Sequence, residues 1–392
     1  MTTSSNNEVE NNLRKELLKS VKRVVVKVGS GVLTAADGLN MTIINELATA
    51  ICHIEKKGIE VILVSSGAIA SGLKKIGFST RPNSVSQQQA MAAAGQSSLM
   101  MAYEEAFGHH GKKVAQILLT RDDLNHRGRY LNARNTIFTL LSWNVIPIIN
   151  ENDTVVVDEI KFGDNDNLSA MVTNLTEANL LVNLTNIDGL FNKDPRTNKD
   201  AQLIRIVEKV DRTLKRYASS IPGFLGTGGM ASKISAANKV SLGGIPTIIA
   251  NGLNSGILAK IFSGDEEGTL FLPQQASLCK RKHWIVFTKS PKGALVVDSG
   301  AETAILKNGK SLLPSGIRDV NGRFSIGDSV QLKNEFGTEI AVGMTNYDAS
   351  DIKRIAGKKT SEIESILGFK YGDEVIHRDN LVLTEQMDEC KE

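Results

Sequence analysis

Short apolar runs alternate with longer amphipathic stretches from residue 22 to about residue 272. The runs have the length of strands and are rich in Val, Ile and Leu; they lie at residues 22–28, 60–66, 113–120, 144–150, 179–185 and 245–251. Between them, apolar positions at helical spacing predict helices, of which residues 41–58 and 84–108 are the longest. Strands that are apolar on both faces and alternate with helices are typical of a mainly parallel sheet flanked by helices on both faces. We therefore predict an α/β domain whose strands are buried.

Two shorter patterns depart from this alternation. Residues 154–164, TVVVDEIKFGD, alternate polar and apolar positions beside amide-rich turns, which predicts a hairpin or flap that stands off the sheet. Near the N-terminus, Leu13, Leu17, Leu18 and Val21 recur at helical spacing. They predict a short amphipathic helix that leads into the first strand.

The pattern changes again near residues 272–284. Beyond them, short segments separated by glycines have turn signals at the spacing that is typical of a small mostly-β barrel or sandwich. We expect four parts along the chain: an N-terminal extension at 1–21, the α/β domain at 22–275, a β domain at 281–380 and a C-terminal tail at 381–392.

Composition narrows the class of protein. The chain has 392 residues, 41% of them hydrophobic, which is enough for two domains with substantial cores. The formal net charge of +3 gives no argument for a nucleic-acid or membrane surface. Cys52, Cys279 and Cys390 lack CxxC spacing, so neither a disulfide framework nor a zinc site is predicted. With no apolar run of the length that a signal peptide or a membrane span needs, we expect a cytoplasmic globular protein.

The loops after the predicted strands carry the candidate chemistry, because ligands of parallel α/β sheets bind outside the carboxyl ends of the strands. Lys27 lies in the apolar first strand and is followed by Gly29 and Gly31. A lysine there is costly unless it faces a cleft or an anion, although an edge-strand lysine that reaches solvent is the alternative. Residues 65–72, SSGAIASG, begin a helix whose free N–H groups favour a carboxylate or phosphate, or form an ordinary N-cap.

The segment INENDTVVVDEIKFGDNDNLSA holds two clusters of amide and acidic side chains: Asn150, Asn152 and Asp153, then Asp164, Asn165 and Asp166. A calcium loop does not fit, because Leu175 stands where the EF-hand pattern requires a bidentate acid. Helix capping explains one member of each cluster. The others exceed that need and predict a site for a polar ligand.

Two further loops favour a nucleotide. Thr185, Asn186 and Asp188 follow a buried strand and predict either contacts to a base or ribose or an ordinary turn. Residues 226–233, GTGGMASK, place glycines before a helix that carries Lys233, although the GxxxxGK[ST] pattern does not fit. Two lysines, a glycine-rich helix start and no strong nucleophile together indicate phosphoryl transfer by positioning and charge neutralisation.

These segments resemble the amino acid kinase family in order and spacing. The resemblance runs from about Lys22 to Leu272 through VVVKVGSGVLT, VSSGAIASG, LLTRDDL, RYLNARNT, PIINENDTV, IKFGDNDNLSA, KDPR and GTGGMASK. The rest of the chain, including VDSGAETAIL and GKSLLPSGI, resembles a PUA domain. The fold class implied is an amino acid kinase fold followed by a small mostly-β PUA barrel. NEND with GDNDNLSA and a trailing PUA domain is most similar to the family members that phosphorylate L-glutamate.

The resemblance implies a reaction. ATP, with Mg²⁺, would phosphorylate the γ-carboxylate of L-glutamate to γ-glutamyl phosphate, the first step of proline biosynthesis. Proline would be a feedback inhibitor, and the protein would form a homo-oligomer. No protein ligand to the metal is implied.

Site residues are implied as well. Lys27 and Lys233 would neutralise the phosphates, and Asp164 would hold both lysines. The substrate would contact seven residues: Ser66, Gly67, Ala68, Asn150, Asp153, Asn165 and Asp166. ATP would contact nine residues: Lys27, Gly29, Thr185, Asn186, Thr227, Gly228, Gly229, Met230 and Lys233. Asn186 stands where the family usually has an acid, so whether Asn186 or Asp188 contacts the nucleotide stays open.

Two other functions are weighed against this one. A related kinase could act on N-acetylglutamate, aspartate or a nucleoside monophosphate, but Asp153 and Asp166 supply charge that suits a free α-amino group. A non-catalytic RNA-associated regulator would use the PUA domain. Residues 281–392 hold 16 Lys and Arg against 17 Asp and Glu, which argues against RNA binding.

Overall fold

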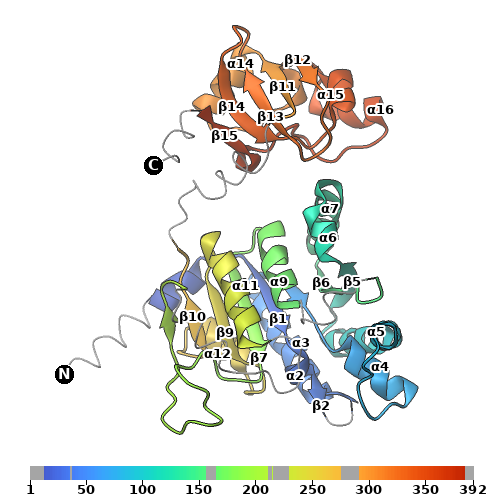
Figure 1. Cartoon of the computed structure of the whole chain (residues 1–392), viewed down its shortest axis with the longest axis vertical. Coiled ribbons are helices and arrows are strands. Elements are labelled where there is room, and N and C mark those ends of the chain that lie inside the picture. Colours follow the sequence, from blue (N-terminus) through green and yellow to red (C-terminus); the bar gives the residue numbers. More distant parts are fainter. Residues whose placement is uncertain are drawn as a thin grey trace, which may run out of the picture. The chain divides into compact units, whose positions relative to one another are not determined.

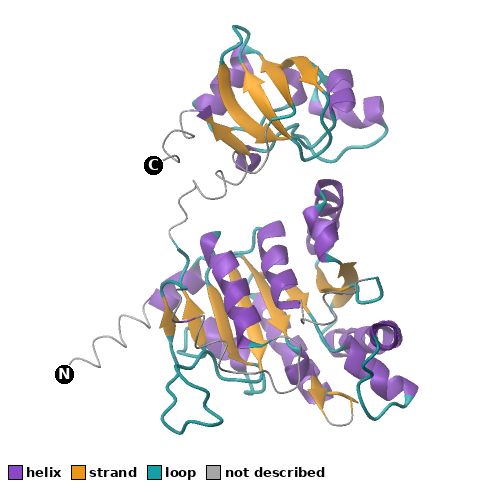
Figure 2. Cartoon of the chain, viewed as in Figure 1, coloured by secondary structure: helices purple, strands orange, loops and turns teal. Residues whose placement is uncertain are grey.

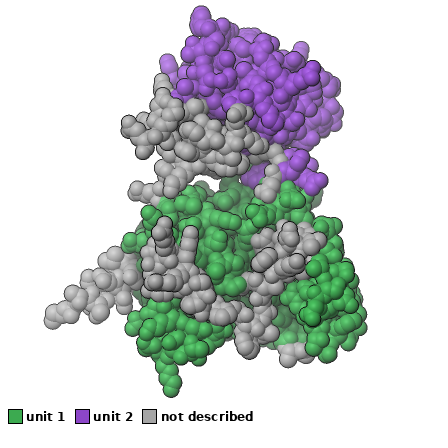
Figure 3. Space-filling model, viewed as in Figure 1, with its two compact units in different colours: residues 1–124, 134–275 green, residues 125–133, 276–392 purple. Residues whose placement is uncertain are grey.

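The structure is a computed structural model that describes residues 13–35, 38–155, 165–210, 214, 229–274 and 291–384. The chain divides into two compact units. Residues 1–124 and 134–275 form unit 1, and residues 125–133 and 276–392 form unit 2 (Figure 3).

Unit 1 is built on one eight-stranded sheet (Figure 1). Its strands, in their order across the sheet, are β5 (Lys113–Leu119), β6 (Val145–Glu151), β4 (Glu60–Val64), β1 (Arg23–Val28), β7 (Leu180–Thr185), β9 (Thr247–Asn251), β10 (Thr269–Phe271) and β8 (Ile206–Val207). All neighbouring strands pair in parallel except β9 and β10, which are antiparallel. The predicted mainly parallel sheet is confirmed.

Helices cover both faces of this sheet (Figure 2). The helices of unit 1 and of the segment 125–133 are α2 (Ser30–Leu33), α3 (Met41–Lys56), α4 (Ala68–Ile76), α5 (Val85–Gly108), α6 (Arg121–Asn125), α7 (Arg127–Ser142), α9 (Asn165–Leu175), α11 (Met230–Leu242) and α12 (Ile257–Ser263). A small hairpin is formed by β2 (Thr34–Ala35) and β3 (Gly38–Leu39), and residues 13–19 are helical, as their spacing predicts.

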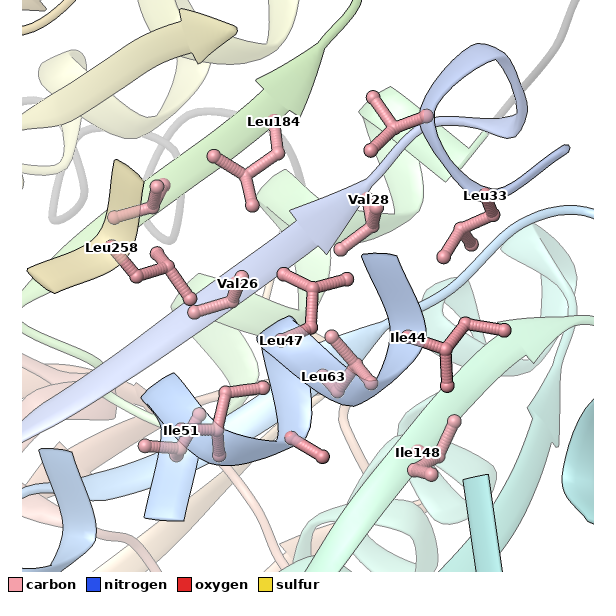
Figure 4. Close-up of a cluster of buried hydrophobic side chains, with 14 of the residues drawn as sticks. Val26, Val28, Leu33, Ile44, Leu47, Ile51, Leu63, Ile148, Leu184 and Leu258 are labelled. Carbon is pink, nitrogen blue, oxygen red and sulfur yellow. The ribbon is translucent and has the colours of Figure 1, made fainter. Parts of the chain in front are cut away.

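Strand alternation assigns each helix to a face. Val24, Val26 and Val28 of β1 belong to one core cluster, together with the buried residues of α3 and α12 (Figure 4). The intervening position, Lys27, therefore points to the opposite face, where α9 packs against β1 and β7. Each apolar side chain fully buried in this way stabilises the fold by about 1.5–3 kcal/mol relative to an exposed one. The same alternation thus fixes both the core and the direction of the lysine.

One strand differs from its prediction. Residues 113–120 were expected to be buried, but β5 is the edge strand and pairs only with β6 among the described strands. Leu118 is 37% exposed, whereas Leu119 is buried. An apolar run does not by itself distinguish a central strand from an edge strand, because both need one buried face.

Unit 2 contains a five-stranded sheet. Its strands, in order, are β12 (Ile317–Gly322), β11 (Gly293–Val297), β13 (Ser329–Lys333), β14 (Glu339–Met344) and β15 (Leu381–Leu383). The helices of residues 291–384 are α14 (Ser299–Leu306), η1 (Pro314–Gly316), α15 (Ala349–Ile355), η2 (Thr360–Glu362), α16 (Ile363–Leu367) and η3 (Arg378–Asn380). The mostly-β character of this part is confirmed. We expected the tail to begin at residue 381, but β15 pairs with β14 there and extends the sheet beyond residue 380.

Several expectations fall outside the described residues. They concern the N-terminal residues 1–12, the change of pattern near residue 280, and all of the predicted flap except Thr154 and Val155, which are exposed. Among the described helices, none combines the length and the apolar character that a membrane span requires.

Candidate active site

Lys27 lies near the carboxyl end of β1, in the middle of the sheet. It is only 4% exposed, so the alternative of an edge-strand lysine that reaches solvent is wrong. The strand register places it beside Asn183 of β7 and Val64 of β4. The chain then turns at Gly29, whose N–H donates to the carbonyl of Leu184 at 3.0 Å. A buried ammonium group needs a counter-charge, and the structure provides one.

Asp166 of α9 binds both lysines. Its Oδ1 lies 2.5 Å from Lys27 Nζ, and its Oδ2 lies 3.0 Å from Lys233 Nζ. Ser232 Oγ also donates to Oδ2, at 2.6 Å, and Asn183 Nδ2 donates to Oδ1, at 3.1 Å. The carboxylate thus accepts from four donors, close to the limit of its lone pairs.

This geometry corrects the predicted roles of the acidic cluster. We expected Asp164 to hold the lysines and Asp166 to bind substrate, but Asp166 holds both lysines, and Asp164 lies outside the described residues. The reason is the phase of α9, whose buried polar positions Asp166, Ser169 and Thr173 repeat at i, i+3 and i+7. That spacing indicates that Asp166 lies on the buried face of α9, but it does not show which residues Asp166 contacts.

Burial and charge set the protonation of this cluster. Burial lowers the pKa of Lys27 to about 8, although the nearby Asp166 carboxylate opposes the shift. Burial alone would raise the pKa of Asp166, but the charges of Lys27 and Lys233 outweigh it and hold the pKa well below its usual range. At neutral pH two lysines therefore share one carboxylate, an arrangement that suits an anionic ligand.

A row of hydrogen-bonded polar side chains, called the amide chain below, lies next to the lysines. It consists of Ser66, Asn165, Asn150 and Gln96. Asn165 Nδ2 donates to Ser66 Oγ at 3.0 Å and to Asn150 Oδ1 at 3.1 Å. Asn150 Nδ2 donates in turn to Gln96 Oε1 at 2.9 Å. The structure therefore brings together Ser66, Asn150 and Asn165, which the sequence placed in one substrate site. Gln96 and Asn183 were missed, because a polar residue inside a regular helix or strand does not show which partner it faces.

Gly67 and Ala68 form the start of α4. Gly67 has φ 98°, a left-handed conformation that favours glycine, and Ala68 is buried. The helix then crosses α5 at very close range: a Cβ on Gly95 would lie 1.9 Å from the carbonyl oxygen of Ala68, and one on Gly72 would lie 1.8 Å from that of Met91. This backbone contact fixes the position of the loop that carries Ser66.

The predicted nucleotide residues lie at the ends of β7 and α11. Thr185 is buried at the end of β7. The side chain of Asn186 packs against Gly31: a Cβ added to that glycine would lie 3.2 Å from Asn186 Nδ2. Asp188 accepts from Asn251 Nδ2 at 2.9 Å, so one oxygen of its carboxylate is paired with the end of β9. Gly229 is the N-cap of α11 and Met230 its first residue, whereas Thr227 and Gly228 lie outside the described residues. Asp153, partly buried, lies in the turn after β6.

Comparison with known proteins identifies the family. Residues 22–251 match the model of the amino acid kinase family, and residues 293–367 match that of the PUA domain. The protein named glutamate 5-kinase from Geobacter sulfurreducens is 56% identical over 372 residues, which cover 95% of this chain and 100% of that protein. The glutamate 5-kinase of Pelobacter propionicus is 51% identical over the same shares of both chains.

Solved structures are more distant. A UMP kinase from Bacillus anthracis is 18% identical, with a TM-score of 0.45, and the match covers 64% of this chain and 96% of that one. The sequence matches are therefore the basis of the assignment. They extend over nearly the whole chain, and they include the segments that carry Lys27, Asp166 and Lys233. This chain belongs to the amino acid kinase family.

Proposed function

We propose that this chain transfers the γ-phosphoryl group of ATP to the γ-carboxylate of L-glutamate. The proposal rests on one arrangement. The carboxylate of Asp166 binds both Lys27 and Lys233. Ser66, Asn150 and Asn165 of the amide chain lie beside this cluster. Relatives that match 95% of the chain at more than half identity, and that are named glutamate 5-kinase, support the same substrate.

The chemistry needs no general base. The γ-carboxylate has a pKa of about 4.3 in water and is ionised at neutral pH. One of its oxygens forms a bond to the γ-phosphorus, the bond from that phosphorus to the β–γ bridging oxygen breaks, and ADP leaves with the electron pair. Since Asp166 accepts from four donors, its role is to hold the lysines, which neutralise charge on the transferring group.

Mg²⁺ fits this site through the nucleotide. The described residues contain no group of three His, Cys, Asp or Glu side chains that could hold a metal, and Asp166 is already occupied by its donors. Mg²⁺ commonly keeps several water ligands and binds substrate phosphates. The ion would therefore be held by phosphate oxygens and water, and it would neutralise charge on the phosphates.

The remaining roles follow from position. We assign Thr185, Asn186, Gly229 and Met230 to the nucleotide, with Thr227 and Gly228, and we favour Asn186 over Asp188 because it lies against the loop at Gly31. Asp153 would meet the α-ammonium group. Proline resembles a glutamate whose side chain has closed onto its α-nitrogen. It would therefore compete with glutamate for binding at the amide chain. The protein would act as a homo-oligomer, with residues 281–380 as a structural or regulatory PUA domain.

Acyl phosphate formation tests the proposed function. With ATP, Mg²⁺, hydroxylamine and L-glutamate, we expect γ-glutamyl hydroxamate, because hydroxylamine traps acyl phosphates. N-acetylglutamate should give a rate lower by at least about 100-fold, because a site built for a polar group discriminates strongly against ligands that cannot pair with it. Aspartate, which is shorter by one methylene, should give a rate lower by about 10- to 200-fold. Absence of hydroxamate above a control without enzyme, or a faster rate with N-acetylglutamate, contradicts the proposal.

The pH dependence tests the charge on Lys27. Its pKa of about 8 in the free enzyme means that the ammonium group is lost as the pH rises through that value. We expect kcat/KM for ATP, measured with glutamate well below its KM so that the free enzyme is the species observed, to fall above about pH 8 and to approach a tenfold decrease per pH unit. Bound phosphates favour the charged form of Lys27. The fall of kcat at alkaline pH should therefore occur at a higher pH than the fall of kcat/KM. Identical limbs for both parameters would show that Lys27 is not the titrating group.

A further inference from the structure

Two polar atoms of the amide chain are buried without a partner. Gln96 Oε1 accepts from Asn150, but Gln96 Nε2 is buried and makes no hydrogen bond to any described residue. At the other end, Asn165 Nδ2 donates to Ser66 and Asn150, and Asn165 Oδ1 is likewise buried and unpaired among the residues that the structure describes. The chain of amides therefore ends in one unused donor and one unused acceptor.

Such atoms are rare and informative. Buried amide groups are nearly always paired, and an exception calls for a specific explanation such as a bound partner. The roles of the paired atoms are fixed: because Asn150 donates through Nδ2, Gln96 must present Oε1 to it, so its N–H donors lie on the other side of the amide. The same argument makes Asn165 Oδ1 an acceptor, since its Nδ2 is used twice.

We propose that Gln96 determines specificity for an α-amino acid, by donating from Nε2 to the α-carboxylate of the substrate while Asn165 Oδ1 accepts from the α-ammonium group. A zwitterion offers one acceptor group and one donor group, which complement the two unpaired atoms. The inference rests on the proposed function and names the residue that recognises the end of glutamate remote from the reaction.

The place of the amide chain in the site supports this orientation. Asn165 directly precedes Asp166, which holds Lys27 and Lys233, so one end of the chain lies beside the group that neutralises phosphate. From there the hydrogen bonds pass through Asn150 of β6 to Gln96 of α5. A substrate that presents its γ-carboxylate to the lysines would thus meet Gln96 with its other carboxylate.

A structural role for Gln96 is the alternative, in which it only positions Asn150. Two substitutions separate the two roles. Gln96→Glu keeps an acceptor for Asn150 Nδ2 but replaces the donor by a negative charge, whereas Gln96→Met removes both. Gln87→Met is the matched control, because Gln87 is exposed on the same helix.

The test measures KM and kcat for L-glutamate with the full-length protein. A hydrogen bond to a charged group predicts that Gln96→Met raises KM for glutamate by about 10- to 100-fold with a smaller change in kcat. Gln96→Glu should raise it further, because its carboxylate repels the α-carboxylate. Gln87→Met should match the wild type. If Gln96→Glu keeps the wild-type KM, Gln96 acts only through Asn150 and the proposal is overturned.

A substrate analogue gives an independent measurement. 4-Aminobutanoate has the amino group and the carboxylate that reacts but lacks the α-carboxylate, so its inhibition constant against glutamate should be the same in the wild type and in Gln96→Met. An equal loss for both compounds contradicts the proposal. A wild-type protein that forms no γ-glutamyl hydroxamate contradicts the proposed function itself, whereas normal wild-type activity with an unchanged KM in both Gln96 variants contradicts only this inference.

Discussion

Asp166→Asn is expected to lower kcat/KM for both substrates by on the order of 1000-fold, because it removes the charge that holds two lysines in place. The change is nearly isosteric, so the packing of α9 should persist. Lys27 and Lys233, both buried, would then share a neutral amide and repel each other. Breaking a buried ion pair from one side typically costs about 3–5 kcal/mol. We therefore expect the free energy of unfolding to fall by about that amount, as measured by denaturant titration.

Asp200→Asn is the matched control for this variant. The same chemical change is made there in an exposed pair with Lys193, where the two side chains are 49% and 70% exposed, so its effect on stability should be small. Wild-type turnover and an unchanged unfolding midpoint for Asp166→Asn would show that the two ammonium groups need no counter-charge. The assignment of Asp166 as the group that holds the lysines would then be wrong.

Gly95→Ala is expected to destabilise the catalytic unit and to weaken glutamate binding together. A Cβ at this position would lie 1.9 Å from the carbonyl oxygen of Ala68 and 2.3 Å from the backbone nitrogen of Gly72, and backbone atoms cannot rotate away as a side chain can. Overpacking of this kind commonly costs 1–3 kcal/mol, and a backbone clash lies at or above the upper end, about 3 kcal/mol. Because α4 follows Ser66 and Gly67 directly, its displacement should also raise KM for glutamate.

Gly108→Ala provides the comparison within the same helix. Gly108 is the last residue of α5, and a Cβ there meets no atom within 4 Å. Since alanine has the higher helix propensity, this variant should be neutral or slightly more stable in thermal unfolding. If Gly95→Ala also unfolds at the wild-type temperature with an unchanged KM, the close crossing of α4 and α5 does not position the substrate loop.

The sequence predicted much of the fold because strands and helices differ in local periodicity. Alternating apolar runs and amphipathic stretches were enough to predict β1, β4, β6, β7 and β9 and the helices between them. The same reasoning overstated the burial of β5, because the position of a strand in a sheet depends on its neighbours and not on its own residues. The segment around residues 381–383 was assigned to a tail for a similar reason: a strand of three residues has too short a pattern to be recognised without its partner, β14.

The candidate site was predicted where a residue type conflicts with its surroundings. A lysine in an apolar strand and another after glycines at a helix start are costly in a core, so Lys27 and Lys233 were identified as ligands of an anion before any geometry was known. Ser66, Asn150 and Asn165 were found because they follow strands or begin a helix at one edge of a parallel sheet. Gln96 and Asn183 lie within regular elements, where a polar residue alone does not reveal which partner it faces.

By itself, the sequence determined the α/β architecture, the mostly-β second unit, the two lysines and the amide-rich ligand site, because each depends on spacing within a short segment. Only the tertiary structure decided which acid holds the lysines. Asp164 and Asp166 are separated by a single residue, and the phase of α9 against β1 and β7 selects Asp166. The contacts that result join Asp166 to residues 139 and 67 positions away in the chain, and no local pattern encodes contacts between segments so far apart.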